Sequence, residues 1–192
     1  MYNGKLVQRV VSEKIQRIQK MGSGSYSSGI LAKLRRGVGK EPGEDPELMG
    51  YVVSHIPEDF LSKGSAPSRE EWAIYLSLTL FALHQQGHDI TIHCMNSDEG
   101  SFGSSLRQIA IGDANAKERI AKRLKAFGVS HDMNEAGYYL RQMIQLLRSA
   151  GVRVNYGELA KDLYVFQYTD GKQKVFLKWG QDFYKTSDKT ED

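Results

Sequence analysis

The feature that most constrains the fold is a run of twelve residues, 72–83, in which only two members are polar and none is charged. Ser68 and Glu71 precede it at the spacing of a capping box, in which a hydroxyl and a carboxylate satisfy the free amides at a helix start. Gly87 ends the pattern. Twelve residues are too few to cross a bilayer, which takes about 20 in a helix. We therefore expect a helix that is buried on nearly every side and forms the centre of the core.

Apolar residues recur at helical spacing along most of the chain, which predicts a largely helical protein. Asp113 and Asp132 stand where helix N-caps are expected, and Glu135 would complete a second capping box. Gly37 and Gly151 stand where the helices before them end. In addition to the central helix, we expect helices over residues 6–21, 30–36, 46–55, 102–111, 113–127 and 132–150.

The C-terminal third fits two different structures. Residues 156–166 have the apolar spacing of a helix, whereas residues 163–179, centred on Asp170 and Gly171, also resemble a β-hairpin with a tight turn. Short apolar runs do not distinguish strands from helices. From the residues alone, both alternatives stay open.

The composition excludes several classes of protein. Hydrophobic residues make up 40% and charged residues 26% of the 192, which is typical of a globular protein and not of a disordered or fibrous one. Cys94 is the single cysteine, so no disulfide can form within the chain, and a reducing cytosol is the expected compartment. The first 20 residues lack the apolar core of a signal peptide. We therefore expect a cytoplasmic protein without a membrane partner.

No pattern in the sequence points to a catalytic centre. His84, His88, His93 and Cys94 form a metal-like cluster, but Gly87 interrupts it and no pair of cysteines accompanies it. We interpret the cluster as a helix end with solvated histidines, and we expect neither a metal nor a cofactor. No serine stands in a nucleophile elbow, and no carboxylate stands among apolar residues that would tune it as an acid. These omissions predict a protein that is not an enzyme.

Charge is segregated along the chain, although the net charge is only +3. Residues 1–40 contain nine basic residues and one acidic residue, and residues 107–153 contain nine basic and four acidic ones. Between these segments, residues 41–71 carry eight acidic and two basic residues, and residues 72–106 carry no Lys or Arg. Two basic segments flanking an acidic middle indicate a polyanionic partner on one face.

The clearest positive feature is a set of basic residues on helix faces opposite the apolar stripes. Arg141 and Arg148 are seven residues apart, and Arg119 and Arg123 are four apart, so each pair projects from one side of its helix. Each guanidinium offers a planar fork that suits phosphate oxygens. An ordinary solvated surface is the plain alternative. The candidate nucleic-acid-binding residues are Lys33, Arg35, Arg36, Arg107, Arg119, Lys122, Arg123, Arg141 and Arg148.

Several segments, in their order and spacing, resemble the small subunit of the type I-E CRISPR Cascade complex, the CasB family. These segments are residues 34–37, 72–84, 101–107, 122–127, 140–147, 155–163 and 179–184. The resemblance spans residues 30–184. It implies an all-α, non-enzymatic protein, a compact multi-helix bundle with two small helical subdomains, and it favours helices over a hairpin in the C-terminal third.

The residue patterns, together with the two subdomains that the resemblance implies, predict a division of the chain into four parts. They are an N-terminal helix with a Gly/Ser linker (1–29), an N-terminal helical subdomain (30–112) with a mobile loop (87–103), a C-terminal helical subdomain (113–184) and a flexible tail (185–192).

The partners that the resemblance implies are guide (CRISPR) RNA, the target and displaced DNA strands, a second copy of the chain, and the backbone and large subunits of Cascade. Basic residues of the family guide the strands. The matching positions here are Arg35, Arg36, Arg107, Lys122, Arg123 and Arg141. Opening a duplex on a guide RNA is a near-balanced exchange that phosphate contacts can tip, so the expected role is to stabilise the R-loop in antiviral defence. The alternatives are a helical protein–protein adaptor and a helix-turn-helix DNA-binding protein.

Overall fold

The structure, a computed structural model, describes residues 2–185. Within that range the regular structure consists of nine α-helices and one 3-10 helix, with a lone β-bridge between two loops. The prediction of an all-α fold is confirmed. The elements are α1 (Tyr2–Lys20), α2 (Ser25–Arg36), α3 (Pro46–Val53), η1 (Glu58–Phe60), α4 (Arg69–His84), α5 (Phe102–Ala110), α6 (Ala114–Gly128), α7 (Met133–Ser149), α8 (Tyr156–Phe166) and α9 (Thr169–Tyr184).

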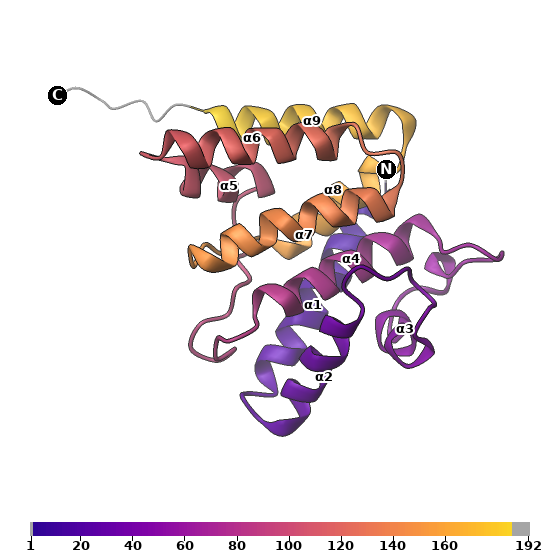
Figure 1. Cartoon of the computed structure of the whole chain (residues 1–192). Coiled ribbons are helices and arrows are strands. Elements are labelled where there is room, and N and C mark those ends of the chain that lie inside the picture. Colours follow the sequence, from indigo (N-terminus) through magenta and orange to yellow (C-terminus); the bar gives the residue numbers. More distant parts are fainter. Residues whose placement is uncertain (1, 186–192) are drawn as a thin grey trace.

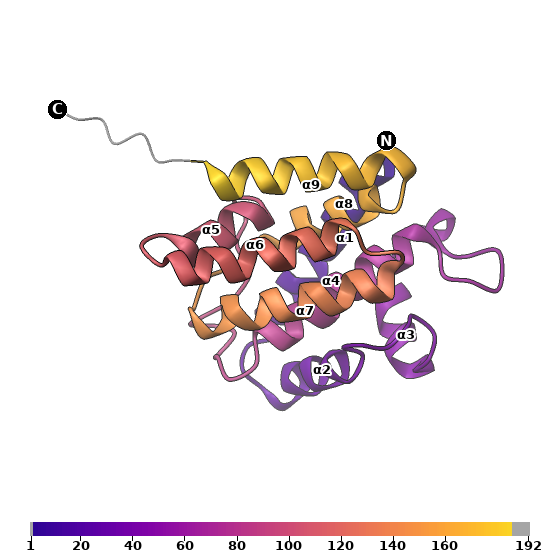
Figure 2. The same ribbon diagram turned by 45° about the horizontal axis from the view of Figure 1, so that its top comes forward.

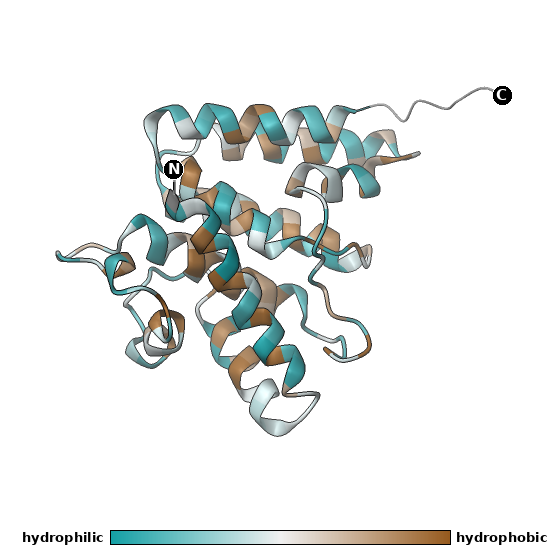
Figure 3. Ribbon diagram, turned by 180° about the vertical axis from the view of Figure 1, so that it is seen from behind, coloured by the Kyte–Doolittle hydropathy of each residue, from teal (hydrophilic) through white to brown (hydrophobic). Residues whose placement is uncertain are grey.

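Five helices, α1, α2, α3, α7 and α8, pack against α4. In Figure 1, α5, α6 and α9 form a group at the top, α7 and α8 cross the middle, and α1 to α4 lie below. The upper group is joined to the rest by contacts of α6 with α7 and of α8 with α9. Figure 2 shows that α7 lies between α6 and α2. Seen from behind, most helices alternate polar and apolar segments, as amphipathic helices do (Figure 3).

The central helix forms as its sequence predicts. The Ser68 hydroxyl accepts a hydrogen bond from the Glu71 amide at 3.0 Å, and the Glu71 carboxylate accepts one from the Ser68 amide at 2.7 Å. Every residue of α4 from Ala73 to His84 is buried. The expectation of a fully buried central helix is confirmed, and its burial on all sides explains why the helix needs no amphipathic pattern.

The predicted N-caps of α6 and α7 are also present, with one difference. Asp113 accepts a hydrogen bond from the Ala116 amide at 2.9 Å, and Asp132 accepts one from the Glu135 amide at 2.8 Å. The Glu135 carboxylate, however, accepts from the amide of His131 at 2.7 Å, one residue before the cap. The predicted hydrogen bond from the Asp132 amide to Glu135 is therefore wrong, whereas the Asp132 cap and the start of the helix are as predicted.

The C-terminal third is helical throughout residues 156–166 and 169–184, so the hairpin alternative is wrong. Asp170 and Gly171, which suggested a tight turn, lie in the first turn of α9. A β-carbon on Gly171 would lie 1.7 Å from the carbonyl oxygen of Val165 at the end of α8. The glycine thus permits a close approach of two helices instead of forming a hairpin turn.

The linker between α1 and α2 is shorter than expected. The sequence predicts a Gly/Ser linker through Gly29, but α2 begins at Ser25, and only residues 22–24 reverse the chain, with Gly22 at a φ of +73°. Ile30 and Leu31 pack into the core, and this burial outweighs the weak helix propensity of the glycine and serines before them.

The boundaries between the predicted subdomains, and the mobility of the loop 87–103, stay predictions. The loop is anchored where it reaches the core, because the Met95 amide donates to Gln85 and the Val154 amide donates to the Met95 carbonyl. Of the predicted tail, only Lys185 is described, and residues 186–192 lie outside the described range. No helix within residues 2–185 is both long enough and apolar enough to span a bilayer.

Candidate nucleic-acid interface

Arg119 and Arg123 project from α6, whose apolar stripe, including Ile120 and Leu124, is buried. The Arg123 Nε donates to Gln142 Oε1 of α7 at 3.1 Å, and its Nη1 donates to the Arg119 carbonyl at 3.0 Å. The two helices run side by side in Figure 2. The Arg123 guanidinium is thus held in the seam between α6 and α7, with Arg119 exposed one turn earlier.

Arg141 is exposed on α7 and lies beside the loop that follows α2. Its Nη1 lies 3.8 Å from the position that a β-carbon of Gly39 would take. Both residues line a cleft of about 340 Å³ between α7, α4 and the loop after α2. Lys40 adds a cation to this cleft, and Glu41 and Glu44 add two carboxylates. The cleft is therefore mixed in charge, with Arg141 at its solvent-exposed side.

We call Arg119, Arg123 and Arg141 the α6–α7 basic face. Among residues 2–185, none of the three forms an ion pair with a carboxylate. Their neighbour Lys122, in contrast, pairs with Glu118 at 2.7 Å on an exposed surface. Guanidinium groups that lack carboxylate partners repel one another and are available to an anion.

Two of the predicted residues are engaged with other helices. Lys33 of α2 forms an ion pair with Glu47 of α3. The Nη1 of Arg148 donates to Gln86 Oε1 at 3.2 Å, just beyond the end of α4. These contacts tie helices together, so both side chains have a structural role that their spacing in the sequence does not reveal.

The other predicted residues lie at separate edges of the molecule. Arg107 Nη1 donates at 2.9 Å to the carbonyl oxygen of the residue that follows α9. Arg35 and Arg36 end α2, and Gly37 follows them against α4, where a β-carbon would lie 2.7 Å from the Tyr75 hydroxyl. Five of the nine candidates thus lie on the neighbouring helices α6 and α7, and two of these five, Lys122 and Arg148, are engaged by Glu118 and Gln86. The other four belong to α2 and α5.

The metal-like cluster is not a set of solvated histidines. His84 is fully buried, and its Nδ1 lies 2.9 Å from the hydroxyl of Tyr156. Burial lowers the pKa of His84 to about 4, with a smaller contribution from His88. The expectation of solvation is wrong for His84, which belongs to the core, whereas His88 and His93 are exposed. Within residues 2–185, no three potential metal ligands come together.

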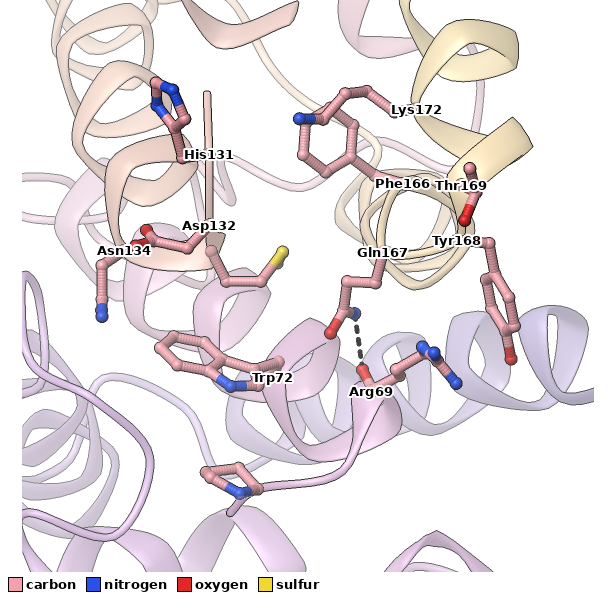
Figure 4. Close-up of a pocket in the computed structure, with 12 residues that line it drawn as sticks. Arg69, Trp72, His131, Asp132, Asn134, Phe166, Gln167, Tyr168, Thr169 and Lys172 are labelled. Carbon is pink, nitrogen blue, oxygen red and sulfur yellow. Dashed lines mark hydrogen bonds between the residues drawn. The ribbon is translucent and has the colours of Figure 1, made fainter. Parts of the chain in front are cut away.

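A second concave site, which the sequence does not reveal, lies where α4, α7 and α9 begin. It encloses about 620 Å³ and is lined by Arg69, Trp72, Asp132, Tyr168 and Lys172, among others (Figure 4). Its walls come from segments roughly 35 to 60 residues apart in the chain. No local pattern could have predicted it, because only the packing of three helix starts creates it.

Comparison with known proteins identifies relatives of this architecture. The family described as CRISPR-associated protein Cse2 matches residues 30–184. The crystal structure of CasB from Thermobifida fusca is 25% identical, with a TM-score of 0.76 over 94% of this chain and 98% of that one. A Cse2-family protein from Thermus thermophilus is 24% identical, with a TM-score of 0.64 over 93% and 97%. A chain of a CRISPR RNA-guided surveillance complex is 21% identical, with a TM-score of 0.65 over 92% of each. No curated protein sequence matches significantly.

Proposed function

Since this chain belongs to the Cse2 family of CRISPR-associated proteins, we propose that it is a non-catalytic subunit of a CRISPR Cascade complex. In this role it contacts phosphates of the guide RNA, the target DNA and the displaced strand, and it stabilises the R-loop in antiviral defence. Its proposed protein partners are a second copy of itself and the backbone and large subunits. The shared fold of a chain from a CRISPR RNA-guided surveillance complex supports the proposal.

The observation that carries the proposal is the α6–α7 basic face. Its three guanidinium groups have no carboxylate partner within residues 2–185, and the neighbouring α7 side chains, Gln142 and Gln145, are neutral. A sugar–phosphate strand laid along the two helices would neutralise these charges and release its condensed counterions. The same arginines would gain little from a neutral or basic protein surface.

Phosphate contacts can stabilise an R-loop without reading its sequence. The RNA–DNA heteroduplex that forms is about as stable as the DNA duplex that it replaces, so small contributions decide the balance. Contacts made only with the opened strands shift it toward the open state, and specificity stays with the guide RNA. Lys122 can join these contacts at little cost, because an exposed pair such as that with Glu118 contributes at most about 1 kcal/mol.

The proposal predicts that replacing Arg119, Arg123 and Arg141 together by alanine weakens target-DNA binding by the assembled complex about 10- to 100-fold, from the loss of three phosphate contacts. Equilibrium binding of matched target DNA, measured at one fixed salt concentration, tests this.

A charge-matched control replaces three exposed cations of α1, Arg9, Arg17 and Lys20, by alanine. This control removes the same charge as the triple variant. It should nevertheless bind target DNA like the unmodified complex, because α1 lies outside the α6–α7 basic face. If both variants lost the same affinity for target DNA, the effect would come from overall charge and not from the α6–α7 basic face, and the proposal would be overturned. Failure of the triple variant to assemble would favour the protein–protein adaptor, and a preference of the isolated chain for one duplex sequence would favour a helix-turn-helix protein.

A further inference from the structure

An apolar groove lies between α6 and α9, and it shares no residue with the α6–α7 basic face. We call it the α6–α9 groove. Its volume is about 850 Å³, and its apolar lining includes Ala121 and Leu124 of α6 and the Phe176 and Tyr184 rings of α9. Figure 2 shows α6 and α9 running side by side. A groove between two such helices has a shape that accommodates a third helix.

Apolar side chains at this groove stay exposed in the folded chain. Leu177 and Tyr184 of α9 are 60% and 56% exposed, and Val129, which follows α6, is 66% exposed. A second concavity of about 660 Å³ is lined by Leu177 and shares Phe176, Gly180 and Tyr184 with the groove, so the two form one surface. Contiguous exposed apolar side chains with a polar rim mark interaction sites, whereas single ones need no explanation.

Gly180 leaves a hollow in the middle of this surface. Phe176, Gly180 and Tyr184 are four residues apart, so they form one row along α9 that spans about 12 Å, or two helical turns. A β-carbon on Gly180 would have no atom within 4 Å, so the space between the two rings is open. The Phe176 ring is held in place against Gly128 of α6, where a β-carbon would lie 2.6 Å from it. The hollow can therefore receive one apolar side chain of a partner.

The rim of the groove is mainly positive. The Lys117 Nζ lies 5.6 Å from the centroid of the Tyr184 ring, and Lys125 lines the groove. Among residues 2–185, neither lysine forms an ion pair with a carboxylate. Glu118 is the one acidic residue of the lining, and it is paired with Lys122. An acidic partner would therefore be attracted, whereas two copies of the chain that met through this groove would place lysines against lysines.

We propose that the α6–α9 groove docks an acidic amphipathic helix of a protein partner, with an apolar anchor such as leucine in the hollow at Gly180 and carboxylates opposite Lys117 and Lys125. This site goes beyond the proposed contacts with nucleic acid and does not depend on them. A sugar–phosphate strand would use the lysines but would leave Leu177 and Val129 uncovered. Residues 186–192 of the chain itself include no apolar side chain and so cannot supply the anchor.

Designed peptides test the groove in the isolated full chain. The probe is a fluorescein-labelled helical peptide of about 16 residues, with leucines spaced three and four residues apart on one face and glutamates beside them. Fluorescence anisotropy should give a Kd of about 100 μM or tighter. Two control peptides should each bind at least about tenfold more weakly. One has the same composition with its leucines scrambled off the common face, and the other has lysine in place of every glutamate.

Filling the hollow separates docking from folding. Gly180→Leu has open space for its side chain and removes a glycine from a helix, so the variant should fold, and it should bind the glutamate peptide at least about tenfold more weakly. Gly29→Leu is the matched control, because Gly29 is an exposed glycine within α2 that also has open space around it, and this variant should retain the affinity. Lys117→Glu combined with Lys125→Glu should reverse the preference, so that the lysine peptide binds more tightly than the glutamate peptide.

Several results would refute the docking site. These are no binding of the glutamate peptide by the unmodified chain, equal binding of the scrambled peptide, and equal affinities of the Gly180 and Gly29 variants. A dimer of the isolated chain that Gly180→Leu abolishes would assign the groove to a second copy, and oligothymidine binding that Gly180→Leu abolishes would assign it to a nucleic acid. Either result would also refute the proposal. All of these measurements leave the R-loop role to its own test in the assembled complex, in which no residue of the groove is changed.

Discussion

At the scale of single residues, burial changes the chemistry of His84 most clearly. The ring lies between α4 and α8, next to the Tyr156 hydroxyl, and its Nε2 has no hydrogen-bond partner among residues 2–185. Burial holds its pKa at about 4, against an ordinary value of 6.5, so the ring is neutral at physiological pH. A charged ring at this position would have to be paired or to become exposed.

This shift predicts a pH-dependent stability. Between pH 6.5 and 4 the unfolded chain binds a proton at His84 that the folded chain excludes, so acidification over this window favours unfolding. The free energy of unfolding should fall by up to about 3 kcal/mol from this group alone. Urea unfolding of the unmodified chain and of His84→Asn, followed between pH 7 and 4, checks the prediction. The free energy of unfolding of the asparagine variant should depend less on pH. If both proteins lost stability in parallel as the pH fell, His84 would not be the cause of the pH dependence.

At the scale of elements, α8 and α9 are joined by a buried polar contact. Asp162 is 4% exposed, and it accepts hydrogen bonds from Trp179 Nε1 at 2.7 Å and from Lys178 Nζ at 2.8 Å. Asp162→Ala would leave the indole N–H without its acceptor and the Lys178 ammonium with Glu158 alone. We expect a loss of about 2–4 kcal/mol in the free energy of unfolding, measured by chemical denaturation.

The exposed loop residue Asp98 provides the control for this measurement, because removing a surface carboxylate changes stability by about 0.5 kcal/mol or less. If Asp98→Ala and Asp162→Ala were equally stable, the polar contact between α8 and α9 would not contribute to the stability of the fold.

The helix boundaries also show which sequence patterns predict structure correctly. The capping box before α4 and the aspartates before α6 and α7 fixed those helix starts correctly, because a cap is a local contact. The start of α2 was missed, since packing and not propensity forms it. Gly171 suggested a hairpin because its actual constraint, the carbonyl of Val165, comes from another helix. The local cap signals located the helix starts, although the reciprocal contact expected of Glu135 is absent among the described residues, whereas features that depend on packing were not predictable.

At the scale of the whole molecule, the candidate site was predictable only in part. Helical spacing correctly grouped Arg119 with Arg123, because both belong to one helix. It could not show that Lys33 pairs with Glu47, a residue of a different helix. The seam between α6 and α7, and the pocket around Trp72, exist only once the helices have packed. Nucleic-acid binding by these residues stays a prediction.

The measurement that tests the central claim most directly is the salt dependence of target-DNA affinity in the assembled complex. Each phosphate contact adds about 0.9, or about 0.7 for a single strand, to the slope of log affinity against log salt. Alanine at Arg119, Arg123 and Arg141 should therefore make the slope shallower by about 2 to 3, whereas the α1 control variant should retain it. An unchanged slope in the triple variant, even with reduced affinity, would mean that these arginines contact protein and not phosphate, and would contradict the account.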